Sequence, residues 1–284
     1  MSSSSLKPLE DQIAGHTEED GGSENIPRFL KSDEGYVFKP VPTTRGGKEL
    51  EFYKSLDKYD KTLVEFLPKY IRTEIVNNIP YMGIEDLTYG YLEDFANVAD
   101  IKMGTRTYDN SATEEKIKAE EHKSSKTTTK SLGIRFCGAK LVHPNTGEKT
   151  KLSKVWGKQL KHDRIYEDGI KRFFWHPDRS VKENQLIVKS FLNKLERLLT
   201  FFENNQQFAF YSSSLLFVYG PTDSNKSKLR DTITLVSDDS NIGISLKMID
   251  FAHVDPLTPP TKDESYIFGL KNLISFFNQL LSEN

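Results

Sequence analysis

Short stretches in which apolar and polar residues alternate recur along the chain, and this period of two is typical of strands with one buried face. One such stretch, GYVFKPV, ends at Lys39, because Pro40 and Pro42 prevent further pairing. Another surrounds the short acidic link Glu85-Asp86. The predicted strands are residues 11–15, 35–39, 79–92, 98–104, 131–143, 208–220 and 244–254.

Other stretches repeat their apolar residues every three to four positions, as amphipathic helices do. The longest covers residues 181–205, and residues 264–281 form the last. A helix beginning at about Gly47 places its apolar residues on one side. Residues 113–126 are charged and rich in helix-forming residues, and residues 157–174 also have a helical pattern.

The order of these elements predicts an α+β protein of two lobes. Strands dominate the first third of the chain, and helices mixed with a few strands follow. We place an N-terminal lobe at residues 11–87 and a C-terminal lobe at residues 88–284, joined near residues 85–90. The Ser-rich residues 1–10 are expected to form a disordered tail, and the polar residues 221–240 a mobile insert.

Composition narrows the class of protein. The 284 residues suffice for two lobes with a sizeable core, and 39 Lys and Arg nearly balance 41 Asp and Glu. This balance argues against a dedicated nucleic-acid binder but allows a local basic pocket. Cys137 is the single cysteine, so we expect no intrachain disulfide and a reducing compartment. Neither a signal peptide nor a membrane span is expected, because long apolar runs are missing.

Asp100, Lys102 and Gly104 stand at alternate positions in the stretch VADIKMG. Residues two apart on a strand point to the same face, so Asp100 and Lys102 should project side by side. Such a pair can bind a metal-nucleotide complex, hold a phosphate, or form a surface ion pair of little value. Gly104 favours a ligand site, because glycine lets the backbone approach a ligand closely.

Two further features have phosphotransferase chemistry as one interpretation. Lys39 ends a strand and Glu49 lies in the next helix, as in kinases whose lysine reaches the nucleotide phosphates; a solvated lysine beside an unrelated acid is the alternative. Asp250 follows an apolar strand in MIDFAHV, where Mg²⁺ ligands tend to sit, although an ordinary strand end would look the same. The stretch resembles the Asp-Phe-Gly of protein kinases, with Ala252 as the third residue.

Several motifs are missing or weak. The lysines of the helix at residues 113–126 alternate with acids, and alone they indicate a solvated face. The chain has no GxxxxGK[ST], HExxH or GxSxG motif, so a P-loop enzyme is not expected. The HRD loop of protein kinases is missing too, because KHDRIYEDG has His162, Asp163 and Arg164 in another order.

Together these residues resemble the inositol polyphosphate kinase family, whose signature is PxxxDxKxG. In ANVADIKMG the Asp, Lys and Gly match, while Ala96 stands where the family usually has proline, which removes a backbone constraint but leaves the chemistry in place. The stretches RGGKELEFY, EDL, TTTKSLGIRFCG, SSSLLFVY and MIDFAHV are similar to family motifs in the expected order, over residues 11–284. The compact segment 110–131 is most similar to multikinases of the fungal type, since trisphosphate 3-kinases have a larger insert there.

The resemblance implies a two-lobed fold, distantly like that of protein kinases, with the ATP site between the lobes. It implies that Lys39, steadied by Glu49, contacts the ATP phosphates. It also implies that Glu85 and Leu87 give backbone hydrogen bonds to adenine. ATP and Mg²⁺ are therefore the expected cofactors.

The resemblance also assigns the residues of phosphoryl transfer. Asp100 would hold the ribose and orient the attacking hydroxyl, and Lys102 would bridge the substrate and the transferred phosphoryl group. Asp250 would hold Mg²⁺. The implied contacts to substrate phosphates are Arg45, Lys116, Lys123, Lys126 and His253.

The implied activity is transfer of the γ-phosphate of MgATP to ring hydroxyls of inositol tris- and tetrakisphosphate, ending at a pentakisphosphate. The alternatives are an inositol hexakisphosphate kinase, which forms pyrophosphates, and a scaffold with a secondary kinase role, since fungal multikinases are associated with transcriptional regulation. We expect inositol phosphates and transcription regulators as partners, and no direct contact with nucleic acid. A monomer in the nucleus and cytoplasm is the expected form.

Overall fold

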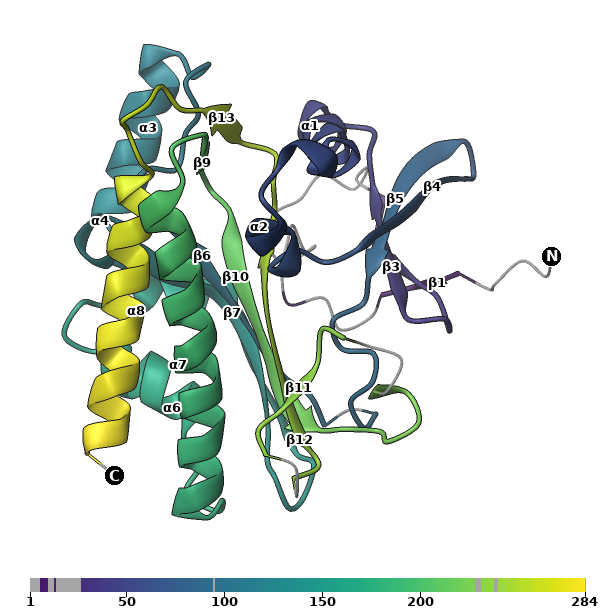
Figure 1. Cartoon of the computed structure of the whole chain (residues 1–284), viewed down its shortest axis with the longest axis vertical. Helices are drawn as coiled ribbons and strands as arrows, with labels where there is room; N and C mark the ends of the chain where they lie inside the picture. The colour runs from purple at the N-terminus through teal and green to yellow at the C-terminus, as the bar shows by residue number, and fades with distance from the viewer. Residues whose placement is uncertain are drawn as a thin grey trace.

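The computed structural model describes residues 6–9, 13, 27–93, 95–227, 231–237 and 240–283, and its strands form two main sheets that face each other (Figure 1). The smaller sheet has the strand order β1-β2-β3-β5-β4, and the larger has the order β11-β12-β10-β6-β7-β8. β9 and β13 form a separate pair. The strands are β1 (Lys7–Pro8), β2 (Leu30–Lys31), β3 (Tyr36–Pro40), β4 (Tyr70–Val76), β5 (Ile79–Glu85), β6 (Asn97–Met103), β7 (Ile134–Val142), β8 (Lys149–Leu152), β9 (Phe208–Phe210), β10 (Ser214–Pro221), β11 (Thr234–Leu235), β12 (Ile242–Ile249) and β13 (Val254–Pro256).

The N-terminal lobe combines the smaller sheet with three short helices, α1 (Thr44–Lys54), η2 (Leu56–Lys58) and α2 (Lys61–Glu65). α1 begins three residues before the predicted start at Gly47, because Thr43 caps it: its hydroxyl accepts the Gly46 N–H at 3.1 Å. β4, an edge strand with an alternating exposure pattern, was not predicted. The sheet ends at Glu85 and the next strand begins at Asn97, on either side of the predicted junction.

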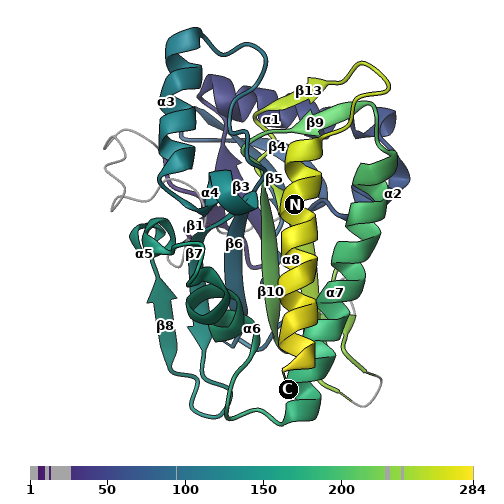
Figure 2. The ribbon, with the colours of Figure 1, turned by 90° about the vertical axis from the view of Figure 1, so that its left-hand side faces the viewer.

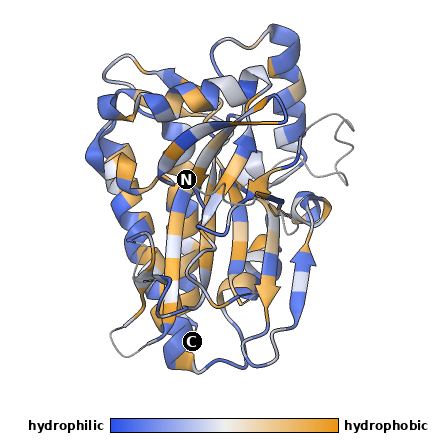
Figure 3. Cartoon of the chain, turned by 90° about the vertical axis from the view of Figure 1, so that its right-hand side faces the viewer, coloured by the Kyte–Doolittle hydropathy of each residue, from blue (hydrophilic) through white to orange (hydrophobic). Residues whose placement is uncertain are grey.

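The larger sheet is covered on one face by the two long helices α7 (Val181–Asn204) and α8 (Glu264–Ser282), which lie side by side (Figures 1 and 2). Ile101, Leu215 and Phe217 point to this face and are fully buried. The ring of Phe217 packs on those of Phe191 in α7 and Phe277 in α8, with centroids 5.3 and 6.3 Å apart. The opposite face of the sheet looks toward the N-terminal lobe, and its strands alternate hydrophobic and hydrophilic residues (Figure 3).

The predicted helix at residues 157–174 is wrong as a continuous element. The structure has α5 (Lys154–Gln159), then the π-helical turn η3 (Tyr166–Lys171) and α6 (Arg172–Phe174). α5 presses on β7 so closely that a Cβ atom on Gly157 would lie 2.0 Å from the Phe136 carbonyl oxygen. The helix ends at Leu160, whose ψ of 130° is not helical.

Two predicted strands are each broken at one residue with a left-handed backbone. Ser212 (φ 57°) separates β9 from β10, and Asp250 (φ 67°) separates β12 from β13. The breaks lie at the same level, because β10 pairs with β12 and β9 pairs with β13. Positive φ values are uncommon outside glycine. Here they turn both strand segments out of the large sheet at the mouth of the cleft.

Two segments predicted to be disordered or mobile include residues with secondary structure. Within the predicted tail 1–10, Lys7–Pro8 form strand β1, and the Leu9 N–H donates to the Phe29 carbonyl at 2.8 Å. Within the predicted insert 221–240, Thr232 is buried and β11 pairs with β12. The rest of the tail and the predicted strand 11–15, apart from Ile13, lie outside the described residues.

The remaining helices, α3 (Glu114–Ser125) and α4 (Thr128–Leu132), precede β7 and stand beside the upper end of α8 (Figure 2). α3 was predicted within a residue at its start, and its cap is Thr113. None of the helices in the described part of the chain combines the length and apolar composition that a bilayer crossing requires.

Candidate active site between the lobes

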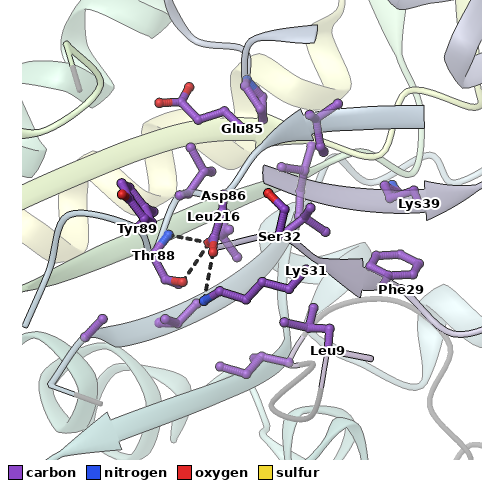
Figure 4. Close-up of a pocket in the computed structure, with 18 of the residues that line it drawn as sticks. Leu9, Phe29, Lys31, Ser32, Lys39, Glu85, Asp86, Thr88, Tyr89 and Leu216 are labelled. Atoms are coloured by element: carbon purple, nitrogen blue, oxygen red, sulfur yellow. Dashed lines mark hydrogen bonds and ion pairs between the residues drawn. The ribbon is translucent and has the colours of Figure 1, made fainter. Parts of the chain in front are cut away.

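A cavity of about 690 Å³ lies between the two sheets, within the size range of small-molecule sites. Val98, Leu216 and Ile249 give it an apolar floor on the large sheet. Its other walls carry polar groups. Two of them, Lys39 and Glu85, lie at different positions along the cavity (Figure 4). A flat apolar floor beside a polar rim suits a ligand with an aromatic base and a charged tail.

The link between the lobes runs along one wall of this cavity. The Glu85 carboxylate accepts the Thr232 hydroxyl at 2.7 Å and the Lys69 N–H at 3.4 Å. Asp86 is held by the Thr88 N–H at 2.8 Å and by Lys31 at 2.9 Å (Figure 4). Leu87 lines the cavity, and its backbone N–H donates to no group among the described residues, so it is available to a ligand.

Lys39 stands between two carboxylates from different lobes. Its Nζ lies 2.9 Å from Glu49 Oε1 and 2.9 Å from Asp250 Oδ1. Burial opposes the charge of Lys39, but Asp250 and Glu49 outweigh it and raise the lysine pKa above its ordinary value. For Glu49, burial raises the pKa and the positive charge of Lys39 only partly offsets this. The predicted pair of Lys39 and Glu49 therefore exists, and it is coupled to the predicted metal ligand.

Asp100 and Lys102 both project from β6 into the cleft, as their spacing predicted. Across the sheet they face Leu216 and Ser214 of β10, respectively. Asp100 is 2% exposed, and its Oδ1 has no hydrogen-bond partner within the described residues. Burial, reinforced by the charge of Asp250, raises the pKa of Asp100 to about 7. A buried carboxyl of this kind is poised to exchange a proton at neutral pH.

Gly104 ends this strand with a tight turn at φ 87°. A Cβ there would lie 2.8 Å from the Ser265 hydroxyl oxygen, which accepts the N–H groups of Thr105 at 2.7 Å and Arg106 at 2.9 Å. The glycine therefore serves a close approach between β6 and α8. This is a structural reason for Gly104, different from the ligand contact that its sequence context suggested.

A second group of polar side chains gathers where β13 meets the start of α1. His253 Nδ1 lies 2.6 Å from Asp109 Oδ2, and Lys48 lies 3.5 Å from the same oxygen. Burial lowers the pKa of His253, Asp109 opposes this, and the charges of Arg45 and Lys116 lower it further. Three of the predicted phosphate contacts, Arg45, Lys116 and His253, thus lie near one another.

The remaining predicted contacts, Lys123 and Lys126, lie on α3. Lys123 pairs with Glu120 at 2.8 Å, and Lys102 is near enough for its charge to lower the Glu120 pKa. Lys116 and Lys123 are seven residues apart and share a helix face. Lys126 is exposed at the C-cap, three residues after Lys123, and its contact with a substrate phosphate stays a prediction.

Sequence reasoning missed two charged residues of the site. Asp109 is 2% exposed, and although burial raises its pKa, the Ser111 hydroxyl, His253 and Lys48 lower it well below the usual value. Arg135 on β7 lies directly opposite Lys102. The alternating pattern of SLGIRFCGAKLVH could have placed Arg135 on the polar face, but only the strand order puts it beside Lys102.

Comparison with known proteins identifies the family. A family model described as inositol polyphosphate kinase matches residues 81–278, well over half of the chain. The chain belongs to the inositol polyphosphate kinase family. Among curated relatives, human inositol polyphosphate multikinase is 32% identical over 235 residues, covering 79% of this chain and 54% of that protein. Mouse inositol hexakisphosphate kinase 2 is 30% identical, covering 73% of this chain and 50% of that protein.

Solved structures of the family have the same fold. The inositol phosphate multikinase Ipk2 of S. cerevisiae, solved with ADP and Mn²⁺, matches with a TM-score of 0.70 and 28% identity, over 87% of this chain and 99% of that one. A second multikinase structure matches with a TM-score of 0.63 and 26% identity, over 82% of this chain and 99% of that one. The two-lobed α+β kinase fold expected from the sequence is confirmed. The chain spans about half the length of the curated relatives it matches.

Proposed function

We propose that this protein is an ATP-dependent kinase that phosphorylates soluble inositol tris- and tetrakisphosphate, ending at a pentakisphosphate. One observation carries the proposal: Lys39 joins Glu49 and Asp250 across the cleft, at 2.9 Å from each, beside the Asp100-x-Lys102 pair. Phosphoryl transfer needs positioned charges more than covalent chemistry, and this arrangement supplies them.

The residues present fit MgATP. The cavity accepts a base on its apolar floor, and the N–H of Leu87 can donate to adenine. Mg²⁺ is usually bound by one or two carboxylates together with substrate phosphates, so Asp250 is a sufficient protein ligand. Among the described residues, no three His, Cys, Asp or Glu side chains form a dedicated metal site, which agrees with this mode. Bound Mg²⁺ would neutralise charge on the phosphates.

The acceptor side fits a highly phosphorylated but incompletely substituted ring. Arg45 and Lys116 lie near His253, and Lys123 and Lys102 lie near Glu120. Direct pairing with phosphate would make contacts from these cations strong. Glu120 lies among them, and although burial opposes it, Lys123, Thr107 and Lys102 lower its pKa, so it stays charged. A carboxylate repels a phosphate and accepts a hydrogen bond from a hydroxyl.

This carboxylate favours tris- and tetrakisphosphate over the hexakisphosphate of the alternative reading, because a fully phosphorylated ring has no hydroxyl to offer. Identity does not separate the two classes, since the multikinase and the hexakisphosphate kinase match almost equally.

Purified protein with labelled ATP, Mg²⁺ and either inositol 1,4,5-trisphosphate or hexakisphosphate tests the choice, with products separated by charge. We expect stepwise tetrakis- and pentakisphosphate from the first acceptor and at least tenfold slower use of the second. Glu120→Gln should reduce the difference in turnover rate between the two acceptors. The exposed Glu114→Gln serves as its control and should leave that difference unchanged. Use of hexakisphosphate alone would overturn the multikinase reading.

We further propose, from the resemblance to fungal multikinases alone, that the protein is a monomer of the nucleus and cytoplasm that also contacts transcription regulators. A strain carrying Asp250→Asn would separate the two roles. If catalysis is the main role, the variant behaves like a deletion. A variant that restores every phenotype of the deletion would put the scaffold role first.

A further inference from the structure

Arg135 is a half-buried cation beside Lys102 that the proposed function has not yet used. It lies on the cleft face of β7, in one row across the sheet with Lys102 on β6, Ser214 on β10 and Ile249 on β12. Neighbouring strands are about 5 Å apart, so Arg135 lies about 5 Å from Lys102 and about 14 Å from Ile249, the residue before Asp250.

Arg135 forms no direct ion pair with an acid of the described residues. Among the described residues, no carboxylate lies within ion-pair distance of Arg135 or of Lys102. The Nε of Arg135 is buried and lacks a hydrogen-bond partner in the described part of the chain. Its only hydrogen-bonding contact there is weak, from a terminal nitrogen to the Cys137 sulfur at 3.9 Å.

Two cations directly opposite each other in a ladder repel, and buried polar groups are normally paired. The charges of both Lys102 and Arg135 act on Asp100, so one carboxyl group is shared between two cations. An anion bound between or above Lys102 and Arg135 would reduce this repulsion. A guanidinium offers two parallel N–H donors, which match the oxygens of a phosphate.

The position of Arg135 points to the acceptor and not to the nucleotide. The groups suited to the ATP phosphates, Lys39 and Asp250, lie at the β12 side of Lys102, and Arg135 lies on the other side. β7 also follows directly on α3 and α4, so Arg135 adjoins the segment that carries Lys116 and Lys123.

We propose that Arg135 is a further substrate-binding residue, whose guanidinium holds the phosphate of the inositol ring nearest to the reacting hydroxyl. This inference rests on the proposed function. In this arrangement Lys102 contacts the transferred phosphoryl group and Arg135 binds the neighbouring phosphate of the ring. The ring is then fixed in the orientation that presents one hydroxyl for attack.

Steady-state kinetics of Arg135→Gln, Arg135→Lys and the exposed control Arg172→Gln test this. For Arg135→Gln we expect kcat/KM for the trisphosphate to fall at least 30-fold while the KM for ATP stays within twofold. Arg135→Lys should recover part of the loss in kcat/KM, because lysine keeps the positive charge but lacks the two parallel N–H donors of a guanidinium. Arg172→Gln should match the wild type.

Three inositol bisphosphates, each lacking a different phosphate of the trisphosphate, allow a thermodynamic cycle that combines the protein variant with each substrate analogue. The penalty of Arg135→Gln should vanish for the one analogue that lacks the phosphate bound by Arg135, and persist for the others. A structural role predicts something else: an equal penalty for all analogues and a lower melting temperature. Under our proposal the variant melts at the wild-type temperature or above, since a like-charge contact is removed.

The outcomes separate the two claims. A wild-type protein that turns over the trisphosphate, together with an Arg135→Gln variant within threefold of it, would overturn this inference alone. An altered KM for ATP, or an equal penalty for every analogue, would also overturn it. A wild-type protein without any inositol phosphate turnover would overturn the proposed function and this inference with it.

Discussion

Asp100 and Lys39 show how burial sets the chemistry of single residues in the cleft. Asp100 is buried without a full set of partners, and its pKa rises to about 7. Lys39 is largely shielded from solvent too, but two carboxylates hold it charged. The same burial thus leaves one group ready to gain or lose a proton and the other permanently charged.

Asp100→Asn is expected to slow turnover by about three orders of magnitude. The same substitution should stabilise the free protein. Between the pKa of an unfolded aspartate, about 4, and the folded value of about 7, the folded carboxyl keeps a proton that the unfolded chain releases. Wild-type unfolding free energy should therefore fall by about 1.4 kcal/mol per pH unit in this window.

Asparagine has no such proton to lose, so the advantage of Asp100→Asn should grow from pH 5 to pH 7 and then level off. Urea unfolding of both proteins at pH 5, 6, 7 and 8 measures it. Parallel stability profiles would show that Asp100 ionises normally. In kinetics, the wild-type rate should rise as pH increases through about 7, because the carboxylate is the active form.

Lys39→Met removes the cation between Glu49 and Asp250 and leaves two facing carboxylates. We expect the unfolding free energy at pH 7 to fall by about 3 kcal/mol, discounted because Asp250 is partly exposed, and the KM for ATP to rise at least tenfold. The loss of stability should shrink toward pH 5 as the carboxylates take up protons. Adding Glu49→Met should restore stability without restoring activity.

At the scale of elements, the site depends on where strands stop and how closely helices approach them. β12 stops at Asp250 because its backbone turns left-handed, and that turn points the carboxylate at Lys39. α5 packs on β7 through Gly157, which has no room for a Cβ atom. β7 in turn carries Arg135, so this contact supports the strand from which we propose that a phosphate is held.

Gly157→Ala is therefore expected to be strongly destabilising, because its Cβ would lie 2.0 Å from the Phe136 carbonyl oxygen. Gly47→Ala is the matched control, since nothing lies within 4 Å of a Cβ at that helical position. We expect Gly157→Ala to lose about 2–3 kcal/mol and Gly47→Ala to gain about 0.5–1 kcal/mol. Thermal unfolding followed by circular dichroism distinguishes them, and equal melting temperatures would contradict the packing account.

Periodicity predicted β6, α3, α7 and α8 nearly to their ends, because each has a strong local pattern. It failed where tertiary contacts decide, at the broken helix of residues 157–174 and at the breaks in the last two long strands. Lys39, Glu49, Asp100 and Asp250 were found from spacing and from the family motifs. Asp109 and Arg135 were not, because their neighbours come from other strands, and strand order cannot be read from a local pattern.

At the scale of the whole molecule, contacts far apart in sequence hold the two lobes at the cleft. The Arg197 guanidinium in α7 pairs with Glu65 of α2 at 2.6 Å, and the Met248 N–H of β12 donates to the Phe66 carbonyl at 2.7 Å. The buried Thr232 adds a bond to Glu85 at the junction. Thr232, which lies within the predicted insert, therefore helps to hold the link between the lobes.

Thr232→Val deletes that hydroxyl and its buried hydrogen bond to a carboxylate, which should cost about 1.5–3 kcal/mol of stability. The KM for ATP should rise several-fold, because Glu85 lies next to the adenine-facing backbone. Thr234→Val, exposed on β11, is the control and should change neither quantity. An unchanged KM in the Thr232 variant would mean that the junction is positioned without this bond.

The central claim is that Asp250, joined to Lys39, drives transfer from ATP to an inositol phosphate hydroxyl. The most direct measurement follows γ-labelled phosphate from ATP to inositol 1,4,5-trisphosphate with the wild type, Asp250→Asn and the exposed control Asp57→Asn. We expect labelled tetrakis- and pentakisphosphate from the wild type and the control, and at least a thousandfold slower transfer from Asp250→Asn. Transfer at the wild-type rate by Asp250→Asn would contradict the account.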